Sequence, residues 1–343
     1  MSKYRVGVMT AEKTIEIREM ELRSPASGQV LIKVECCAIC TMEQRVWSGL
    51  MKRYPFSGGH EMSGTVVEGC GSAAGVKVGD KVAIRMLTSC GECCYCRGGA
   101  ENQCVKSFEA SVHEGLSGPG GLAEYMLVDA KSVYKVADDL KPEFAALSEP
   151  LACCVHSINR GGIELGNDVA VIGVGIMGAL HIQLAKLRGA RVIACEVAHD
   201  RLEVAGAIGA DVLVDSGAAD PVSVIKELTG GRGADVVFCT TALTELASQA
   251  IAMTSNTGRC VLYSSFHPSK PIDLDVNKVH YSEMVITGSV NPTMKDFLTS
   301  TRLLSAKLID PSLLISEIVP FDDLDYAFRR AVDPRTYRVI VKM

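Results

Sequence analysis

No stretch of this chain is both long and apolar enough to cross a lipid bilayer. The most apolar window runs from Val169 to Leu180 and contains three glycines, whereas a spanning helix needs about 20 apolar residues. The first ten residues, MSKYRVGVMT, also lack the apolar segment of a secretory signal. The sequence therefore predicts neither membrane association nor export.

The chain also lacks an excess of basic residues. The chain has 35 Lys and Arg against 40 Asp and Glu, a formal net charge of −5. Basic residues occur only in small groups such as Lys52-Arg53 and Arg329-Arg330, so no basic surface is expected to neutralise a phosphate backbone. Nucleic acid is therefore not an expected partner.

The composition is that of an ordinary globular protein. The 343 residues are 48% hydrophobic and 22% charged, and this length predicts about two domains. In a long chain without a secretory signal, the 14 cysteines are expected to be reduced thiols, metal ligands or core residues rather than disulfides. We expect a cytoplasmic protein.

The sequence pattern changes near residue 150. Before that point, short apolar segments broken by glycines indicate an irregular, mainly β unit. From Asp168 onward, apolar strands alternate with helical stretches, which is typical of βαβ units and a parallel sheet. The predicted strands are Val169–Ile172, Arg191–Cys195, Val212–Val214, Val236–Cys239, Arg259–Tyr263 and Val285–Gly288, and the helices between them include Met177–Leu187, Leu202–Ile208 and Thr244–Met253.

The segment after Asn291-Pro292 fits poorly as a further βα unit. It predicts helices over Lys295–Leu304 and Leu324–Ala331 and a final strand over Arg338–Val341. We expect this tail to pack on the N-terminal unit, so that the α/β domain is an insertion. The expected domains are residues 1–152 with 292–343, and residues 153–291.

A glycine-rich turn follows the first strand of the predicted parallel sheet. It has the form GxGxxG and lies between a strand and a helix. In that setting the glycines permit a tight turn, close approach of a pyrophosphate and close packing of helix on strand, and the helix N-terminus faces the anion. The expected cofactor contacts are Gly173, Gly175, Ile176, Met177 and Gly178, the alternative being an unrelated tight turn.

An acidic residue ends the second strand of that sheet. Glu196 follows Gly178 by 18 residues, where a carboxylate accepts hydrogen bonds from ribose hydroxyls. A carboxylate repels a 2′-phosphate, which favours NAD over NADP, although Arg201 and His199 follow closely and could compensate. The alternative is a solvated loop glutamate.

Four cysteines on one glycine-containing loop have metal-ligand spacing. Cys90, Cys93, Cys96 and Cys104 follow C-x2-C-x2-C-x7-C, and four thiolates this close suit a closed tetrahedral Zn²⁺ site. Cys94 in the same loop is left over. The alternative, a cluster of small buried hydrophobic residues, is disfavoured because a loop offers little core.

A second set of metal-ligand residue types is spread along the chain. It comprises Cys40, His60, Glu61 and Glu149. Each is weak evidence by itself: Cys40 has cysteine neighbours at positions 36 and 37, and His60-Glu61 is no HExxH metalloprotease motif because position 64 is glycine.

Four motifs together carry a resemblance. GGHE at 58–61, the four-cysteine loop, EPLA at 149–152 and GxGxxG at 173–178 resemble, in that order, the zinc-dependent medium-chain dehydrogenases, specifically their polyol and threonine dehydrogenase branch. The resemblance covers essentially the whole chain. It implies a GroES-like, mainly β catalytic domain with a structural zinc lobe at 88–106, an inserted Rossmann domain with a doubly wound parallel sheet, and an active site between the two.

The resemblance also implies the ligands and the reaction. In the polyol branch a cysteine, the histidine of GHE and the glutamate of EPL hold the catalytic zinc, with the glutamate of GHE as a further ligand or neighbour. Carried over, these are Cys40, His60, Glu149 and Glu61, and with the cysteine loop they make two zinc ions per chain. Zinc lowers the pKa of a bound hydroxyl, so a secondary alcohol of a polyol, sugar alcohol or hydroxy-amine is expected to lose its proton and pass hydride to NAD.

The chain departs from the family at the proton relay. Two residues after the ligand cysteine the family has Ser or Thr, where this chain has Met42, and a thioether relays no proton. Thr41 or water is expected to replace it, and Glu43 stands where the family has aspartate. Four further residues lie in loops that can approach the site but are expected more often as scaffold or surface: Trp47, Phe108, His113 and Glu114.

Two other functions remain open. An enoyl- or quinone-type reductase of the same superfamily would lack Cys40, His60 and Glu149, all of which are present. A non-catalytic NAD-sensing protein would hold only the structural zinc, and Met42 alone supports it. By resemblance we expect a homo-oligomer, a tetramer before a dimer, whose nucleotide domains meet through their last strands.

Overall fold

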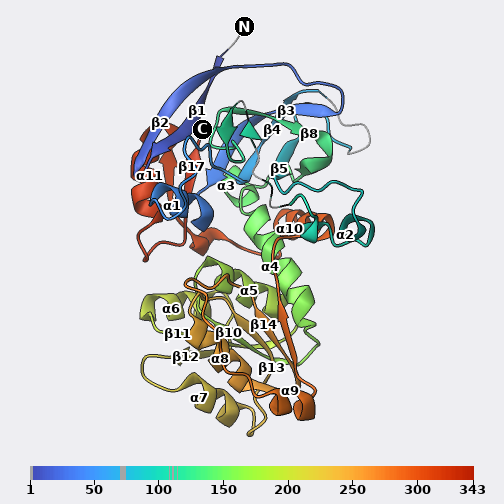
Figure 1. Cartoon of the computed structure of the whole chain (residues 1–343), viewed down its shortest axis with the longest axis vertical. Helices are drawn as coiled ribbons and strands as arrows, with labels where there is room; N and C mark the ends of the chain where they lie inside the picture. Colours follow the sequence, from blue (N-terminus) through green and yellow to red (C-terminus); the bar gives the residue numbers. More distant parts are fainter. Residues whose placement is uncertain (1–2, 70–74, 108, 110–111, 114) are drawn as a thin grey trace. The chain divides into compact units, whose positions relative to one another are not determined.

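The computed structural model describes residues 3–69, 75–107, 109, 112–113 and 115–343 (Figure 1). The chain divides into two compact units. Unit 1 contains Met1–Ala152 and Thr293–Met343, and unit 2 contains Cys153–Pro292. Unit 2 is therefore inserted between two parts of unit 1.

Unit 1 is built on a seven-stranded sheet. The strand order is β16-β17-β3-β4-β5-β9, and β8 also pairs with β3. The strands are β3 (Gln29–Ala38), β4 (Glu61–Glu68), β5 (Lys81–Arg85), β8 (Tyr125–Asp129), β9 (Val133–Lys135), β16 (Ile315–Pro320) and β17 (Arg338–Lys342). Two further pairs are β1 (Lys3–Ala11) with β2 (Thr14–Glu21), and β6 (Val112–His113) with β7 (Leu116–Ser117). The predicted mainly β unit is confirmed.

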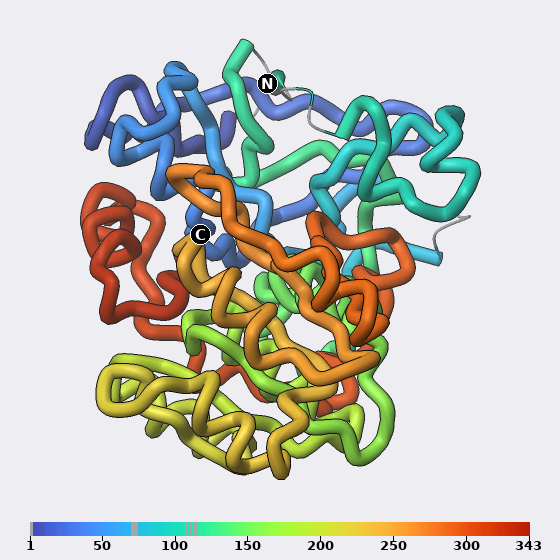
Figure 2. The backbone as a smooth tube through the Cα atoms, turned by 60° about the horizontal axis from the view of Figure 1, so that its bottom comes forward, coloured from blue at the N-terminus to red at the C-terminus, as the bar shows by residue number. Residues whose placement is uncertain are grey.

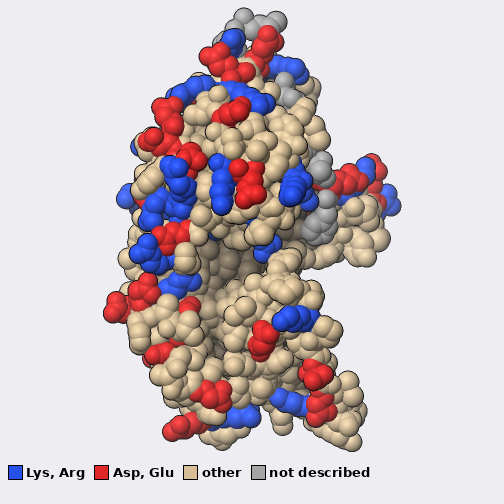
Figure 3. All heavy atoms as spheres, turned by 60° about the vertical axis from the view of Figure 1, so that its left-hand side comes forward, with Lys and Arg blue, Asp and Glu red and all other residues tan. Residues whose placement is uncertain are grey.

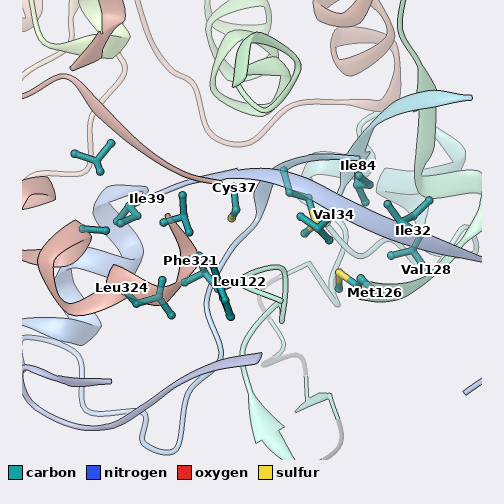
Figure 4. Packing of buried hydrophobic residues seen from close by; sticks show 14 of the residues in the cluster. Ile32, Val34, Cys37, Ile39, Ile84, Leu122, Met126, Val128, Phe321 and Leu324 are labelled. Atoms are coloured by element: carbon teal, nitrogen blue, oxygen red, sulfur yellow. The ribbon is translucent and has the colours of Figure 1, made fainter. Parts of the chain in front are cut away.

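An apolar core lies against this sheet. Ile32 and Val34 of β3 are buried together with Ile84 of β5 and with Met126 and Val128 of β8 (Figure 4). Burying one large aliphatic side chain contributes about 1.5–3 kcal/mol, so the core fixes the strand ends on which the candidate site is built.

The C-terminal segment completes the same sheet. Strand β17 pairs antiparallel with β3, with Ile340 opposite Ala38, and α11 (Leu324–Ala331) contacts α1 (Thr41–Trp47). In two views the red C-terminal helix lies beside the blue N-terminal segment (Figures 1 and 2). The other helices that belong wholly to unit 1 are α2 (Cys94–Arg97), α3 (Pro142–Ala145) and α10 (Met294–Ser305).

Unit 2 is a parallel sheet in the order β12-β11-β10-β13-β14-β15. Its strands are β10 (Asp168–Ile172), β11 (Arg191–Glu196), β12 (Val212–Asp215), β13 (Ala234–Cys239), β14 (Thr254–Leu262) and β15 (Val285–Gly288). Its helices are α5 (Ile176–Leu187), α6 (His199–Ala207), α7 (Pro221–Leu228), α8 (Thr244–Met253) and α9 (Val276–Ser282), preceded by α4 (Ser148–Gly161). The strand order reverses at β10, as in a doubly wound dinucleotide-binding sheet, so the predicted fold class is confirmed.

Two surface properties bear on possible partners. Within the described parts of the chain, no helix combines the length and the apolar character of a membrane span. On the face shown in Figure 3, basic and acidic side chains are interspersed rather than segregated.

A histidine is enclosed in unit 2. His181 of α5 is 0% exposed, and its Nδ1 lies 2.7 Å from the carbonyl oxygen of Met177. A carbonyl only accepts, so Nδ1 carries the proton and Nε2 accepts from the Ser157 hydroxyl at 2.8 Å. Burial lowers the pKa of His181 to about 4, although the hydrogen bond to Met177 acts in the opposite direction.

Because the pKa of His181 is lowered, we expect the free energy of unfolding to decrease in mild acid. An unfolded histidine is protonated below about pH 6.5, whereas folded His181 resists protonation down to about pH 4. The free energy of unfolding is therefore expected to fall by about 3 kcal/mol between those values and to be unaffected by this group above them. Urea unfolding from about pH 7 to about pH 4.5 measures the loss. His181→Gln should make the free energy of unfolding less dependent on pH. His199 has a side chain that is 82% exposed, so the control His199→Gln should keep the wild-type dependence. Parallel curves for the wild type and both variants would contradict the prediction.

Candidate active site and metal centres

The four-cysteine loop folds into a compact thiol cluster in unit 1. The sulfur atoms of Cys90, Cys93, Cys96 and Cys104 all lie within 4.8 Å of one another. Cys94 begins helix α2 and is exposed, and it is not part of this cluster.

Backbone N–H groups are directed at these sulfur atoms. Cys104 accepts from the Cys90 N–H at 3.2 Å and from the Lys106 N–H at 3.4 Å, and Cys93 accepts from the Cys96 N–H at 3.5 Å. The hydrogen bond from Cys96 lowers the pKa of Cys93 to about 6, while burial and neighbouring thiols raise that of Cys96 to about 12. Four thiols gathered within this distance, with backbone N–H groups directed at three of their sulfur atoms, form the type of ligand set that holds a structural Zn²⁺.

The dispersed candidate ligands also meet in unit 1. Ligand atoms of His60, Glu61 and Glu149 lie within 4.8 Å of one another, as do those of Cys40, Glu43 and His60. Cys40 precedes α1, His60 precedes β4, and Glu149 lies in the first turn of α4. The pairing of β3 with β4, in which Ala38 is opposite Glu61, brings the first two of these segments together.

Glu43 orients the histidine. Its carboxylate is 0% exposed, and its Oε1 accepts from the Gly59 N–H at 2.9 Å and lies 2.8 Å from His60 Nδ1. Burial alone lowers the pKa of His60, but the charges of Glu43 and Cys40 raise it well above the usual value. A carboxylate on Nδ1 fixes the ring and leaves Nε2 for a metal.

Besides His60 and Glu149, Glu61 has a partner that the sequence does not suggest. Both of its oxygens accept from the Arg338 guanidinium, with Nε at 2.9 Å from Oε2. Glu61 and Arg338 are 0% and 4% exposed in their side chains, so the pair neutralises two buried charges. Sequence analysis missed Arg338 because it lies in the last strand and resembles an ordinary basic residue.

The other predicted residues are placed as follows. Thr41 is exposed at the start of α1, and Met42 is partly buried and packs on the core. Trp47 is 4% exposed and stacks on Phe328, with ring centroids 6.1 Å apart, so it belongs to the scaffold. Phe108, Glu114 and the side chain of His113 lie outside the described residues.

The glycine-rich turn of unit 2 has the predicted conformation. Gly173 has a φ of +87°, which favours glycine. A Cβ at Gly178 would lie 1.9 Å from the Gly173 carbonyl oxygen, whereas a Cβ at Gly175 would meet only Arg201, at 3.6 Å. The turn is thus closed at Gly178 and open at Gly175, where a pyrophosphate approaches in this type of fold. Ile176 and Met177 form the first turn of α5 behind it.

Glu196 is held at the end of β11. Its Oε2 accepts from the Val174 N–H in the glycine turn at 2.8 Å, and its Oε1 accepts from the N–H groups of Val197 and Ala198 at 2.8 and 3.2 Å. The carboxylate is therefore fixed beside the open part of the turn. The thiol cluster thus fits a zinc ion and the glycine-rich turn fits a dinucleotide, which are the groups that the sequence predicts for them.

Comparison with known proteins agrees with this arrangement. Residues 26–138 match the alcohol dehydrogenase GroES-like domain and residues 173–306 match the zinc-binding dehydrogenase family. The chain is 30% identical to a D-arabitol-phosphate dehydrogenase of Enterococcus avium, covering 94% of this chain and 92% of that protein. It is 31% identical to an L-threonine 3-dehydrogenase of Pyrococcus furiosus, covering 99% of each. A solved zinc-binding dehydrogenase of Sinorhizobium meliloti bound to NADP superimposes with a TM-score of 0.91 at 26% identity and full coverage of both chains.

The chain therefore belongs to the zinc-binding dehydrogenases with a GroES-like domain. It is an oxidoreductase of that family, and both zinc and a nicotinamide cofactor are established at the level of the family. Within the family its relatives are polyol and threonine dehydrogenases, so the predicted branch is confirmed.

Proposed function

We propose that this enzyme oxidises a secondary alcohol of a polyol, sugar alcohol or hydroxy-amine to a ketone, with NAD as hydride acceptor and zinc at the Cys40 cluster. The observation that carries the proposal is that ligand atoms of Cys40 and of Glu149 each lie within 4.8 Å of one of His60 in unit 1. A thiolate, an imidazole and a carboxylate form the type of ligand set that holds a catalytic zinc.

In this proposal the protein supplies position and charge. Cys40, His60 and Glu149 hold the metal, and Glu43 fixes the imidazole through Nδ1. Zinc, when bound, acidifies the alcohol hydroxyl, and NAD accepts the hydride. Arg338 keeps the charge of Glu61 compensated, so that Glu61 serves as a neighbour or a further ligand. The departing proton leaves through Thr41 or water, because Met42 relays none.

The zinc content and the reaction can be tested on one sample. Elemental analysis of protein purified without chelators is expected to give about two zinc ions per chain, and NADH absorbance is expected to rise with a panel of polyols and amino alcohols. One zinc without turnover would show that the site at Cys40 is misassigned. Enoyl reduction without zinc at Cys40 would identify the reductase alternative.

We further propose NAD rather than NADP as the cofactor. Glu196 puts a fixed negative charge at the end of β11, where it would accept from ribose hydroxyls and repel a 2′-phosphate. Glu196→Gln is expected to lower the preference for NAD, measured as the ratio of the kcat/KM values for NAD and NADP, by about tenfold to hundredfold. Glu203→Gln, an exposed position on α6, should leave the ratio unchanged. An unchanged ratio in Glu196→Gln would refute the assignment.

Oligomeric state and location are also proposals. Strand β15 ends the six-stranded sheet, and α9, which directly precedes it in the chain, exposes Val276 and Tyr281 by 69% and 80%. Such an edge favours pairing between copies of the chain, which supports a homo-oligomer, a tetramer before a dimer. A cytoplasmic location stays a prediction of the thiol-rich sequence.

A further inference from the structure

The four-cysteine loop reaches a helix that lies far from it in sequence. Glu101, three residues before Cys104, is 5% exposed, and its Oε1 accepts the backbone N–H of Met294, the first residue of α10. A carboxylate at this position satisfies an N–H group that the helix itself leaves without a partner, and it interacts favourably with the helix dipole.

The surroundings of this contact are buried and charge-compensated. Arg85, the last residue of β5, is 4% exposed. The negative charge of Glu101 favours the charged form of its guanidinium. The ring of Tyr134, another neighbour of Arg85, lies 4.8 Å from the ring of Phe297 in α10. The loop and α10 are therefore joined by one hydrogen bond, and α10 itself packs on β9 beside the arginine on which Glu101 acts.

Helix α10 continues from this contact to the candidate metal ligand Glu149. Ser300, two turns along the helix and 0% exposed, donates its hydroxyl to the carbonyl oxygen of Ser148 at 2.8 Å. Ser148 begins α4 and directly precedes Glu149. One rigid helix thus touches the cysteine loop at one end and the backbone that carries Glu149 further along.

The metal site and Glu101 are also locally coupled. The Cys104 N–H donates to the Glu101 carbonyl oxygen at 3.1 Å, within the turn formed by Glu101–Gln103. When Cys104 is held in a metal site, the backbone of Glu101 is held with it.

We propose that Glu101 is a positioning residue, which couples the four-cysteine metal site through α10 to Glu149 and so sets the metal affinity of the Cys40 cluster. This proposal rests on the proposed function, since it assumes that the Cys40 cluster binds a metal. It assigns the structural metal lobe a role in the geometry of the active site.

The variant Glu101→Ala tests the coupling without unfolding α10. Thr293 and Asp296 form a capping box at the start of that helix, so the helix keeps its own cap. The exposed carboxylate Glu92, in the same loop, provides the matched control Glu92→Ala. Ser300→Ala removes the hydrogen bond from α10 to the Ser148 carbonyl oxygen and leaves the contact between Glu101 and Met294 in place.

Two readouts are needed. Hydrogen exchange of the first turn of α10 is expected to be about tenfold faster in Glu101→Ala and unchanged in Glu92→Ala and Ser300→Ala. Titration of Co²⁺ into zinc-depleted protein, followed by its visible ligand-field bands, reports the metal site. The part of this signal that disappears in Cys40→Ala belongs to the Cys40 cluster. For that part, both Glu101→Ala and Ser300→Ala are expected to weaken Co²⁺ binding by about tenfold and to change the band shape.

The outcomes separate the two proposals. If the Cys40-dependent Co²⁺ signal has wild-type affinity and band shape in Glu101→Ala, the positioning role is refuted, whatever happens to the exchange rate. If wild type and Cys40→Ala give identical Co²⁺ spectra, the proposed catalytic site itself fails. Weaker Co²⁺ binding in Glu92→Ala would also overturn the proposal, because the effect would then come from loop charge alone.

Discussion

Replacing Cys40 by alanine is expected to lower kcat/KM for alcohol oxidation by about three orders of magnitude. The thiol is one of the ligand atoms gathered around His60, and without it the metal that stabilises charge on the substrate oxygen is lost or misplaced. Zinc content should fall from about two to about one per chain. Steady-state kinetics and elemental analysis on the same preparation measure both effects.

Cys94→Ala is the matched control for this experiment. It removes a thiol that is exposed and outside both ligand groups, so zinc content and kcat/KM should stay at wild-type values. Normal turnover and two zinc ions in Cys40→Ala would rule out the assignment of the catalytic site.

Replacing Gly178 by alanine is expected to abolish cofactor binding and to lower the free energy of unfolding of unit 2 by about 3 kcal/mol. The new Cβ would lie 1.9 Å from the Gly173 carbonyl oxygen and 2.9 Å from Thr240 Oγ1. Because the nearest atom belongs to the backbone, the turn and α5 would have to move apart. Thermal unfolding and titration with NADH, followed by its fluorescence, measure the two effects.

Gly175→Ala separates folding from binding at the same turn. Its Cβ would have only an ordinary contact, 3.6 Å from Arg201, so the unfolding temperature should not fall. The methyl group would nevertheless occupy the open part of the turn, and the Kd for NADH is expected to rise by at least about tenfold. Tight NADH binding by both variants would show that the cofactor lies elsewhere.

The fold of unit 2 could be predicted because its signals are local. Each strand is an apolar run followed by a helical period, and all six predicted strands are present. Strand β14 starts at Thr254, five residues earlier than predicted, because Thr254 already pairs with Ala234 before the polar segment 255–258, in which Thr257 has a φ of +59°, and regular pairing resumes at Arg259. In unit 1, α1 was not predicted, since seven residues carry too little periodicity to distinguish a helix from a loop.

The candidate metal ligands that lie close together could be singled out from the sequence, but the groups that contact them could not. Cysteine and histidine are distinctive residue types, and in this chain they belong to motifs that occur in the order typical of the family. Arg338 and Ser300 are not, because an arginine in a strand and a serine in a helix are usually solvated. Only the pairing of β17 with β3 and the packing of α10 against the start of α4 give these residues their partners.

The division of unit 1 into two chain segments has a consequence for biosynthesis. Glu61 and Arg338 are 277 residues apart, and ribosomes add about 5–20 residues per second. Arg338 is therefore made roughly 14–55 s after Glu61. In that time all of unit 2 is synthesised, while the sheet of unit 1 still lacks its last strand. Completion of the Glu61–Arg338 pair is thus a late step, which follows synthesis of the whole inserted unit.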